Sequence, residues 1–202
     1  MGDTGTTPHT ALTTAPTTAP GTAPTTAPSP APAVAWAAFE TAEPELAATV
    51  RERFGQYAHH ALATLRKDGS PRLSGIEADF RDGELCLGMM PNSRKALDVR
   101  RDPRFSLLAN PGEGTGMGGG DVRLSGRAVE ITDPEALARY AADAGAPLPF
   151  HLFRVELTEV VRTSVEGEDL VVRAWTPGRP VRTVRRGTDD SPPRVEPGEA
   201  RS

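Results

Sequence analysis

Two adjacent cations, Arg94 and Lys95, follow Asn92 and Ser93 at a point where the chain is expected to start a helix. Either Asn92 or Ser93 is a natural N-cap, so both cations fall in the first helical turn. Cations there oppose the helix dipole and cost roughly 0.3–1 kcal/mol each. A bound anion would reverse that sign, because backbone N–H groups and two cations would converge on it. The residues alone leave two interpretations open, an anion site and a solvated basic turn.

The elements on either side would hold this turn in place. An apolar run, Leu85-Cys86-Leu87-Gly88, precedes it and is typical of a buried strand. The segment 96–100 follows it as a short helix, which Asp102-Pro103 would end. The turn is therefore expected at a junction between a strand and a helix.

Other residues that could do chemistry are less well supported. Cys86 is the only cysteine, which excludes a disulfide within one chain, and its apolar surroundings favour a buried, inert thiol. His59 and His60 are adjacent and would point to opposite faces of a strand, and His151 is isolated, so no metal site is predicted. The glycines at 112–120 are followed by a strand rather than a helix, which favours a flexible hairpin loop, or a lid, over a nucleotide site.

Composition and charge limit the possible functions. The chain has 202 residues and a formal net charge of −4, which does not favour binding to nucleic acid or to an anionic membrane. No segment is apolar for long enough to span a membrane, so a cytoplasmic protein is expected. Thr-Ala-Pro repeats predict a disordered leader over 1–33, and Pro and Asp residues predict a disordered tail over 187–202. One folded domain is left, over 34–186.

Between these ends, strand patterns alternate with a few helical ones. Asp-Gly turns at 68–69 and 82–83 separate three strands that would form a meander. Gly126 is expected to be a bulge, because the apolar alternation changes phase there. This order predicts a mainly β domain, a small antiparallel barrel with helices packed outside it. The expected helices cover 43–55, 96–100 and 133–145, and the expected strands cover 60–65, 71–80, 84–90, 104–109, 121–131, 150–163 and 169–175.

Several motifs are similar to those of the pyridoxamine 5′-phosphate oxidase-like split-barrel superfamily. The most specific is the Ser-Arg-Lys helix start at 93–95, followed by Arg-Asp-Pro-Arg-Phe-Ser-Leu at 101–107. Ala-Leu-Ala-Thr-Leu at 61–65, Asp-Gly-Ser-Pro-Arg at 68–72 and Leu-Ser-Gly-Arg-Ala at 124–128 add to it. The resemblance covers residues 46–186 and implies a split β-barrel that forms a homodimer and binds FMN or the deazaflavin coenzyme F-420.

The resemblance assigns expected contacts to a set of residues. The Ser-Arg-Lys turn and a basic residue on the second strand would contact the cofactor phosphate, and the backbone at 74–77 would run along the isoalloxazine ring. A methionine near the phosphate would contact the cofactor or pack in the core. A tryptophan and an arginine late in the chain would line the site from the partner subunit. The expected cofactor-binding residues are Arg72, Ser74, Ile76, Glu77, Met89, Ser93, Arg94, Lys95, Trp175 and Arg185.

Two departures from the family pattern bear on the activity. Glu77 stands about where the oxidases carry a lysine, and it is either a residue beside the flavin or a glutamate that faces solvent. The late Arg-Leu-His substrate signature of the vitamer oxidases is absent, and the region 175–185 holds a tryptophan and arginines without a histidine. A true pyridoxamine phosphate oxidase is therefore not expected. The region 175–185 is similar to that of actinobacterial branches of the family in which use of F-420 is common.

The expected function is a flavin- or deazaflavin-dependent oxidoreductase that transfers hydride to or from a small conjugated organic substrate. The cofactor would supply the redox chemistry, so no catalytic side chain is named. Two other classes stay open, because fold alone does not fix function. One is a non-catalytic flavin, deazaflavin or haem binder, with His59, His60 or His151 as the axial ligand of a haem. The other is a cofactor-free interaction module.

Overall fold

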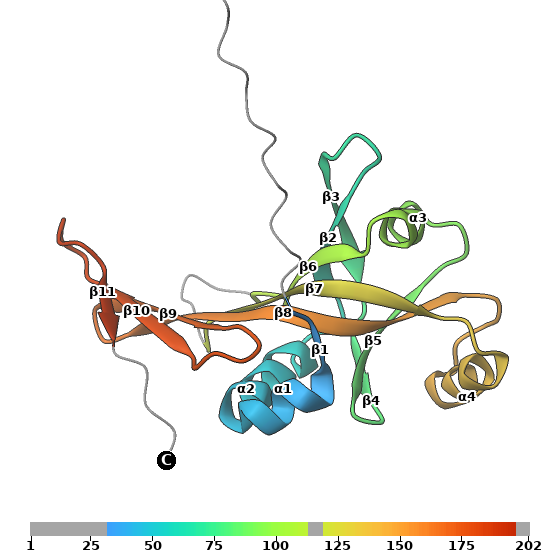
Figure 1. Ribbon diagram of the computed structural model, residues 1–202, viewed down its shortest axis with the longest axis horizontal. Helices are drawn as coiled ribbons and strands as arrows, with labels where there is room; N and C mark the ends of the chain where they lie inside the picture. The colour runs from blue at the N-terminus through green and yellow to red at the C-terminus, as the bar shows by residue number, and fades with distance from the viewer. Residues whose placement is uncertain (1–31, 113–118, 197–202) are drawn as a thin grey trace, which may run out of the picture. The chain divides into compact units, whose positions relative to one another are not determined.

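The computed structural model describes residues 32–112 and 119–196, which lie in the second of two units of the chain, Ala31–Ser202. These residues form an 11-stranded antiparallel sheet with four helices beside it (Figure 1). The predicted leader lies outside the described residues except for its last two positions, and so does most of the predicted glycine loop. The helices are α1 (Trp36–Ala42), α2 (Pro44–Gly55), α3 (Arg94–Arg101) and α4 (Pro134–Ala144). The strands are β1 (Val34–Ala35), β2 (His60–Leu65), β3 (Pro71–Ile76), β4 (Asp79–Arg81), β5 (Glu84–Met89), β6 (Arg104–Leu108), β7 (Asp121–Ile131), β8 (His151–Glu166), β9 (Asp169–Trp175), β10 (Arg182–Arg186) and β11 (Arg194–Glu196).

Strand β8 organises the sheet, because its 16 residues pair with four other strands. One edge of β8 pairs with β7 along most of its length. The other edge is shared: 151–154 pair with β5, 156–157 with β1, and 160–166 with β9. The sheet therefore divides along β8, with β4 and β5 on one arm and β9, β10 and β11 on the other. This arrangement of antiparallel strands confirms the predicted split barrel.

The predicted bulge at Gly126 is confirmed, because the register between β7 and β8 shifts between Ser125 and Gly126. Thr158 has no partner in the register there, and its hydroxyl donates to the Ser125 carbonyl oxygen at 3.2 Å. A Cβ on Gly126 would lie 2.0 Å from the Glu156 carbonyl oxygen. The two backbones thus approach too closely for any side chain at this position.

The predicted three-stranded meander is wrong in one respect. The expected strand 71–80 is two strands, β3 and β4, separated by Glu77 and Ala78. β3 pairs with β2 and is the last strand at its end of the sheet, whereas β4 forms a hairpin with β5, which pairs with β8. The chain therefore passes directly after β3 from the β6–β2–β3 end of the sheet to the arm of β4 and β5, and one edge of β3 stays unpaired among the described strands.

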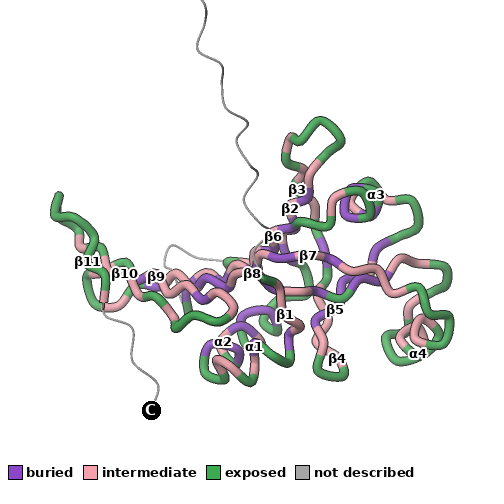
Figure 2. The backbone as a smooth tube through the Cα atoms, viewed as in Figure 1, coloured by how far each residue is buried: buried purple, intermediate pink, exposed green. Residues whose placement is uncertain are grey.

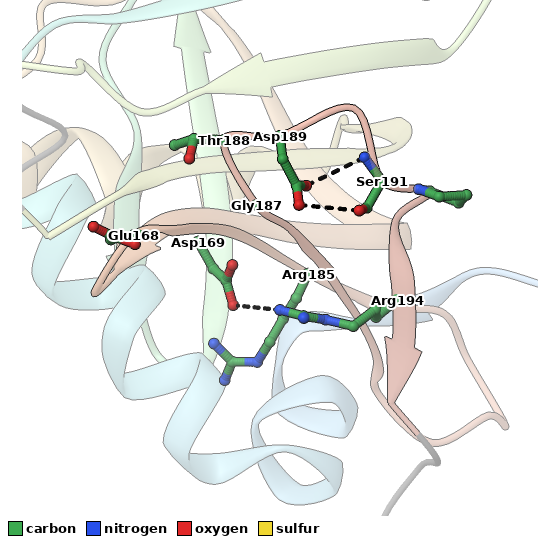
Figure 3. A pocket seen from close by; sticks show the side chains of 9 residues that line it. Glu168, Asp169, Arg185, Gly187, Thr188, Asp189, Ser191 and Arg194 are labelled. Atoms are coloured by element: carbon green, nitrogen blue, oxygen red, sulfur yellow. Dashed lines mark hydrogen bonds and ion pairs between the residues drawn. The ribbon is translucent and has the colours of Figure 1, made fainter.

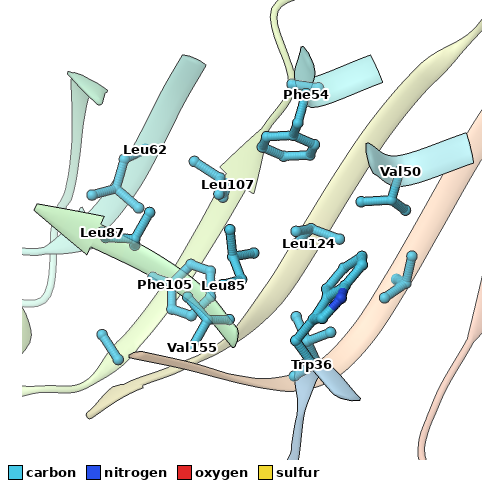
Figure 4. Close-up of a cluster of buried hydrophobic side chains, with 14 of the residues drawn as sticks. Trp36, Val50, Phe54, Leu62, Leu85, Leu87, Phe105, Leu107, Leu124 and Val155 are labelled. Carbon is cyan, nitrogen blue, oxygen red and sulfur yellow. The ribbon is translucent and has the colours of Figure 1, made fainter. Parts of the chain in front are cut away.

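The hydrophobic core gathers side chains of α1, α2 and alternate strand positions (Figure 4). Trp36 and Phe39 of α1 are fully buried and meet edge to face, with ring centroids 5.2 Å apart. Burial also raises the pKa of the Cys86 thiol to about 11, which confirms the inert thiol expected from the sequence. Buried strand residues include Leu62, Leu85, Leu87, Leu107, Leu124 and Val155.

The peripheral elements are less buried than this core. The carboxylate of Asp133 caps α4 by accepting from the Ala136 N–H at 2.8 Å, and Gly145 ends the helix with a φ of 63°. None of the α4 residues is buried (Figure 2). Within the described ranges, no helix has both the length and the apolar character needed to cross a membrane.

The end of the folded domain lies further along the chain than the predicted Arg186. Strand β11 pairs with β10, so that Val195 lies opposite Val184. An ion pair between Arg185 and Glu196 adds a second contact between these strands. The Pro- and Asp-rich composition of this region does not reveal either contact, because both depend on partners that precede it in the chain.

Replacing Gly126 by Ala is expected to lower the free energy of unfolding by about 1–3 kcal/mol, since the added methyl overlaps a backbone oxygen that cannot rotate away. Urea denaturation followed by circular dichroism measures this. Gly55→Ala is the control: nothing lies within 4 Å of a Cβ there, and the change is expected to be neutral or stabilising by up to about 1 kcal/mol. Equal stabilities of the two variants would contradict the close β7–β8 approach.

Candidate functional site

The predicted anion site lies at the start of α3. Ser93 is the N-cap residue, with φ −62° and ψ 144°, and Asn92 before it has a φ of 55°, in the left-handed region. The Ser93 N–H donates to the Met90 carbonyl oxygen at 3.2 Å, which closes the turn between β5 and the helix. Arg94 and Lys95 are the first two helical residues, and no acidic residue lies in this first turn. The local sequence therefore builds the cationic helix start that was predicted.

Two serine hydroxyls near this helix start are buried without a hydrogen-bond partner in the described part of the chain. They are the Oγ atoms of Ser93 on the α3 side and Ser74 on β3. Ser93 does not cap its own helix through its side chain, although its position and residue type allow it. A buried hydroxyl left without a partner costs about 1–3 kcal/mol. An oxygen-rich ligand that accepted from these hydroxyls would remove that cost.

Helix α3 is fixed to strand β3 by side chains of both elements. The Lys95 ammonium donates to the Gly75 carbonyl oxygen at 2.6 Å. One turn further along the helix, the Arg72 Nε donates to the Asp98 Oδ2, also at 2.6 Å. Because Lys95 meets the end of β3 and Asp98 meets its beginning, the helix and the strand run in opposite directions. Their contact brings Arg72, Ser74, Ser93, Arg94 and Lys95 to one α3–β3 junction.

Alternation along β3 decides which side chains face this junction. Arg72 and Ser74 are partly buried and Ile76 is buried, whereas Leu73 and Gly75 between them are exposed. Ile76 and Met89 are members of the hydrophobic core. Core packing is thus the observed role of the Met89 side chain, one of the two alternatives that the sequence left open.

The charges at the junction are partly balanced by groups of the chain itself. Burial lowers the pKa of the Lys95 ammonium, and the nearby Glu77 carboxylate opposes that shift. The Glu77 side chain is 75 % exposed and lies 3.5 Å from the His59 Nε2, which supports the prediction of a glutamate that faces solvent. Arg94 is exposed, and in the described ranges no hydrogen bond or ion pair engages its guanidinium. Arg94 is therefore the cation at this helix start that is most available to a ligand.

Sequence reasoning missed Asp98, Thr64 and Arg101, which lie behind the junction. Asp98 is 4 % exposed and accepts from the Thr64 hydroxyl at 3.0 Å as well as from Arg72. Arg101 pairs with the other Asp98 oxygen and also donates to the Leu65 carbonyl oxygen. A signal was present in the sequence, because an acidic residue on the buried side of a short helix requires a cationic partner.

The family follows from the sequence match over this fold. Residues 46–164, more than half of the chain, match the model of the family described as pyridoxamine 5′-phosphate oxidase. The chain belongs to this family. The match spans both α3 and β3, so the junction described above is part of the family's common domain.

Similar solved structures agree with this fold. A heme binding protein from Mycobacterium smegmatis is 20 % identical with a TM-score of 0.51, over 66 % of this chain and 59 % of that chain. A conserved hypothetical protein from Mycobacterium tuberculosis is 24 % identical with a TM-score of 0.44, over 64 % of this chain and 83 % of that chain. No curated protein matches the chain significantly. The likeness to the heme binding protein concerns the fold alone, and the likeness to the second structure carries no argument.

Trp175 does not join the α3–β3 junction in this member of the pyridoxamine 5′-phosphate oxidase family. Its side chain is 3 % exposed within the single chain, and the centroid of its ring lies 4.7 Å from that of the Phe39 ring. Within one chain, Trp175 therefore packs in the hydrophobic core. The cofactor contact implied by the resemblance stays a prediction.

Arg185 also lies away from the junction within one chain. Its guanidinium bonds to Glu166 at 3.0 Å and to Glu196. It lines a cavity of about 230 Å³ beside the turns that follow β8 and β10, where Arg194 pairs with Asp169 (Figure 3). Two carboxylates thus engage the arginine that the resemblance assigned to a cofactor, and its observed contacts are structural.

Replacing Glu166 by Gln is expected to lower stability at pH 7 and to have a much smaller effect near pH 2. Hydrogen bonds from Arg173 and Arg185 hold the pKa of the Glu166 carboxyl at about 2 in the folded chain, against about 4.3 when unfolded. Because the folded-state pKa is the lower one, the stabilisation is present above pH 4.3 or so and is lost as the pH falls toward 2. Urea denaturation at several pH values measures the difference.

Glu168→Gln is the control for this series, because Glu168 is exposed and makes no ion pair among the described residues. That variant is expected to follow the wild type at every pH. A Glu166→Gln difference that stays constant down to pH 2 would contradict the ion-pair account.

Proposed function

We propose that this chain binds FMN or the deazaflavin coenzyme F-420, with the cofactor phosphate at the start of α3. The observation that carries the proposal is the buried hydroxyl of Ser93, which has no hydrogen-bond partner among the described residues, next to the exposed Arg94. A phosphate offers several oxygens that accept hydrogen bonds, and it is favoured by the N–H groups at a helix start. Membership of the pyridoxamine 5′-phosphate oxidase family supports the choice of a phosphate-bearing redox cofactor.

The residues present fit such a group. Ser93 and Ser74 would donate from hydroxyls that have no partner in the described structure. Arg94 and Arg72 would supply positive charge, and Lys95 would do so if its ammonium also serves the ligand beside the Gly75 carbonyl. The cations that make the start of α3 unfavourable by itself then become favourable contacts.

The cofactor, when bound, supplies hydride transfer, and the chain supplies binding and orientation. The proposed activity is that of an oxidoreductase acting on a small conjugated organic molecule, in the cytoplasm. No general acid or base is assigned. Glu77 is exposed beside His59, and its carboxylate lies near enough to Lys95 to influence the pKa of that ammonium.

A second copy of the chain completes the proposed site. Three apolar side chains are exposed near the α3–β3 junction, namely Leu73, Met90 and Leu97, of which the first two are 74 % and 76 % exposed. They lie on β3, after β5 and on α3, and β3 has an unpaired edge among the described strands. Exposed apolar groups beside a ligand site favour a subunit interface there. The homodimer expected from the resemblance fits this surface.

Two of the three histidines that could ligate a haem have a partner for one ring nitrogen in the described structure. His60 is buried, and its Nδ1 accepts from the Asn110 N–H at 3.2 Å. The His151 Nδ1 lies 2.8 Å from the Glu130 carboxylate. Each of these two rings thus has one nitrogen engaged, and Glu130 also pairs with Arg100 of α3 at 3.0 Å. The third histidine, His59, is 75 % exposed and lies 3.5 Å from Glu77. These contacts leave haem as the alternative ligand.

Replacing Arg94 by Ala is expected to weaken FMN binding by about tenfold or more, which corresponds to one lost charged hydrogen bond of about 1.5–3 kcal/mol. Riboflavin, which lacks the phosphate, should bind the variant and the wild type equally. Quenching of flavin fluorescence during titration of the full chain measures both affinities. The same titration with F-420 replaces FMN if that cofactor binds more tightly.

The matched control is Arg139→Ala, which removes an exposed arginine of α4 that pairs only with Glu135 at 3.9 Å in the described structure. This variant should keep the affinity of the wild type for every ligand. Equal losses of FMN and riboflavin affinity in Arg94→Ala would refute the phosphate assignment. Failure of the wild type to bind either cofactor, or binding of haem instead, would refute the proposed function as a whole.

A further inference from the structure

The carboxylate of Asp98 is the most completely engaged polar group near the proposed site. It is 4 % exposed, in the middle of α3, and receives hydrogen bonds from three different residues. Its Oδ2 accepts from the Arg72 Nε at 2.6 Å and from the Thr64 hydroxyl at 3.0 Å. Its Oδ1 accepts from Arg101 at 3.3 Å. The position and orientation of this carboxylate are therefore fixed from strand β2, strand β3 and its own helix.

We propose that Asp98 is a positioning residue that holds the Arg72 guanidinium in place for the cofactor phosphate without touching the phosphate itself. This inference rests on the proposed function. According to this inference, the buried Asp98 carboxylate contributes indirectly to the affinity for the anionic cofactor.

The geometry at Arg72 supports this role. A guanidinium carries five N–H donors in a rigid plane, and a bond through Nε fixes the direction of the other two nitrogens. In the described structure only the Nε of Arg72 is engaged, by Asp98, and the side chain is 25 % exposed. The two terminal nitrogens thus remain for a ligand on the open side. An arginine held in this way loses little side-chain freedom when the ligand binds.

The charge of Asp98 does not cancel that of Arg72, because Arg101 shares the carboxylate. Arg72 and Arg101 both pair with Asp98, so two positive charges face one negative charge. Arg101 is also tied to the Leu65 carbonyl oxygen at the end of β2, behind the helix start. The group of three therefore keeps one net positive charge, and Arg72 is the member that lies on the same strand as Ser74.

The ionisation of Asp98 at neutral pH agrees with its pairing with two arginines. Burial alone would raise the pKa of the carboxyl, but hydrogen bonds from Arg72 and Thr64 and the charge of Arg72 outweigh it and leave the pKa below its usual value. The carboxylate is thus ionised at neutral pH.

The test separates a positioning role from a purely structural one by comparing FMN with riboflavin. Asp98→Ala in the full chain is expected to weaken FMN binding by about tenfold, the size of one lost charged hydrogen bond, while riboflavin affinity changes less than about twofold. In an Arg72→Ala background, the same change at Asp98 should not weaken FMN binding further. Asp98→Asn keeps an oxygen that can accept from Arg72, and it should recover part of the FMN affinity.

Asp102→Asn is the matched control, because Asp102 also pairs with an arginine, Arg104, at the end of the same helix but away from Arg72. It should leave the ratio of FMN to riboflavin affinity unchanged. If Asp98→Ala does not fold by circular dichroism, Asp98→Asn carries the test, with a smaller loss expected for FMN alone.

Equal losses of FMN and riboflavin affinity, or an effect of Asp98→Ala that persists in the Arg72→Ala background, would overturn the inference while leaving the proposed function intact. Absence of FMN and F-420 binding by the wild type would instead overturn the proposed function and this inference together. The two failures are therefore distinguished by the wild-type titration.

Discussion

The buried contact between Asp98 and Arg72 fixes helix α3 on the edge strand β3, and the proposed site depends on that placement. Burial of a carboxylate is unfavourable unless it is paired and hydrogen-bonded, and here three side chains meet that requirement. The same contact decides where the helix starts relative to the strand. As a result, the hydroxyls of Ser74 and Ser93, which have no hydrogen-bond partner in the part of the chain that the structure describes, belong to one junction rather than to two unrelated surfaces.

The position of β3 in turn follows from the way β8 shares one of its edges. Since β5, β1 and β9 occupy successive parts of that edge, the sheet divides there, and after β3 the chain passes from the β6–β2–β3 end of the sheet to the arm of β4 and β5. An edge strand with an open side can receive a helix start, a ligand or a second copy of the chain. A continuous meander would have left no such opening beside Ser74.

Much of the fold could be predicted from local patterns. Strands β7 and β9 have the predicted bounds, and the bulge at Gly126 is visible as a change of phase, because alternation along a strand is a local property. The break of the predicted strand 71–80 could not be seen in the local sequence. It depends on the pairing of β5 with β8, a strand that lies far along the chain. β11 was missed for the same reason, because its partner is another strand.

The candidate site could be predicted only in part. The Ser93–Lys95 turn was identified because its charges conflict with the helix dipole, which is a signal within four residues. Asp98 was not identified, because its role depends on the hydrogen bond from Arg72, which lies on another strand. Trp175 and Arg185 were assigned by resemblance, and the structure places one in the core beside Phe39 and the other between two glutamates. Spacing along the chain could not show that these side chains already had partners.

The most direct test of the central claim is a crystal structure of the full chain grown with FMN and, separately, with F-420. The account predicts electron density for the phosphate within hydrogen-bond distance of the Ser93 hydroxyl and of a terminal nitrogen of Arg72. A phosphate bound instead in the cavity lined by Arg185 and Arg194, with the start of α3 free of ligand, would contradict it.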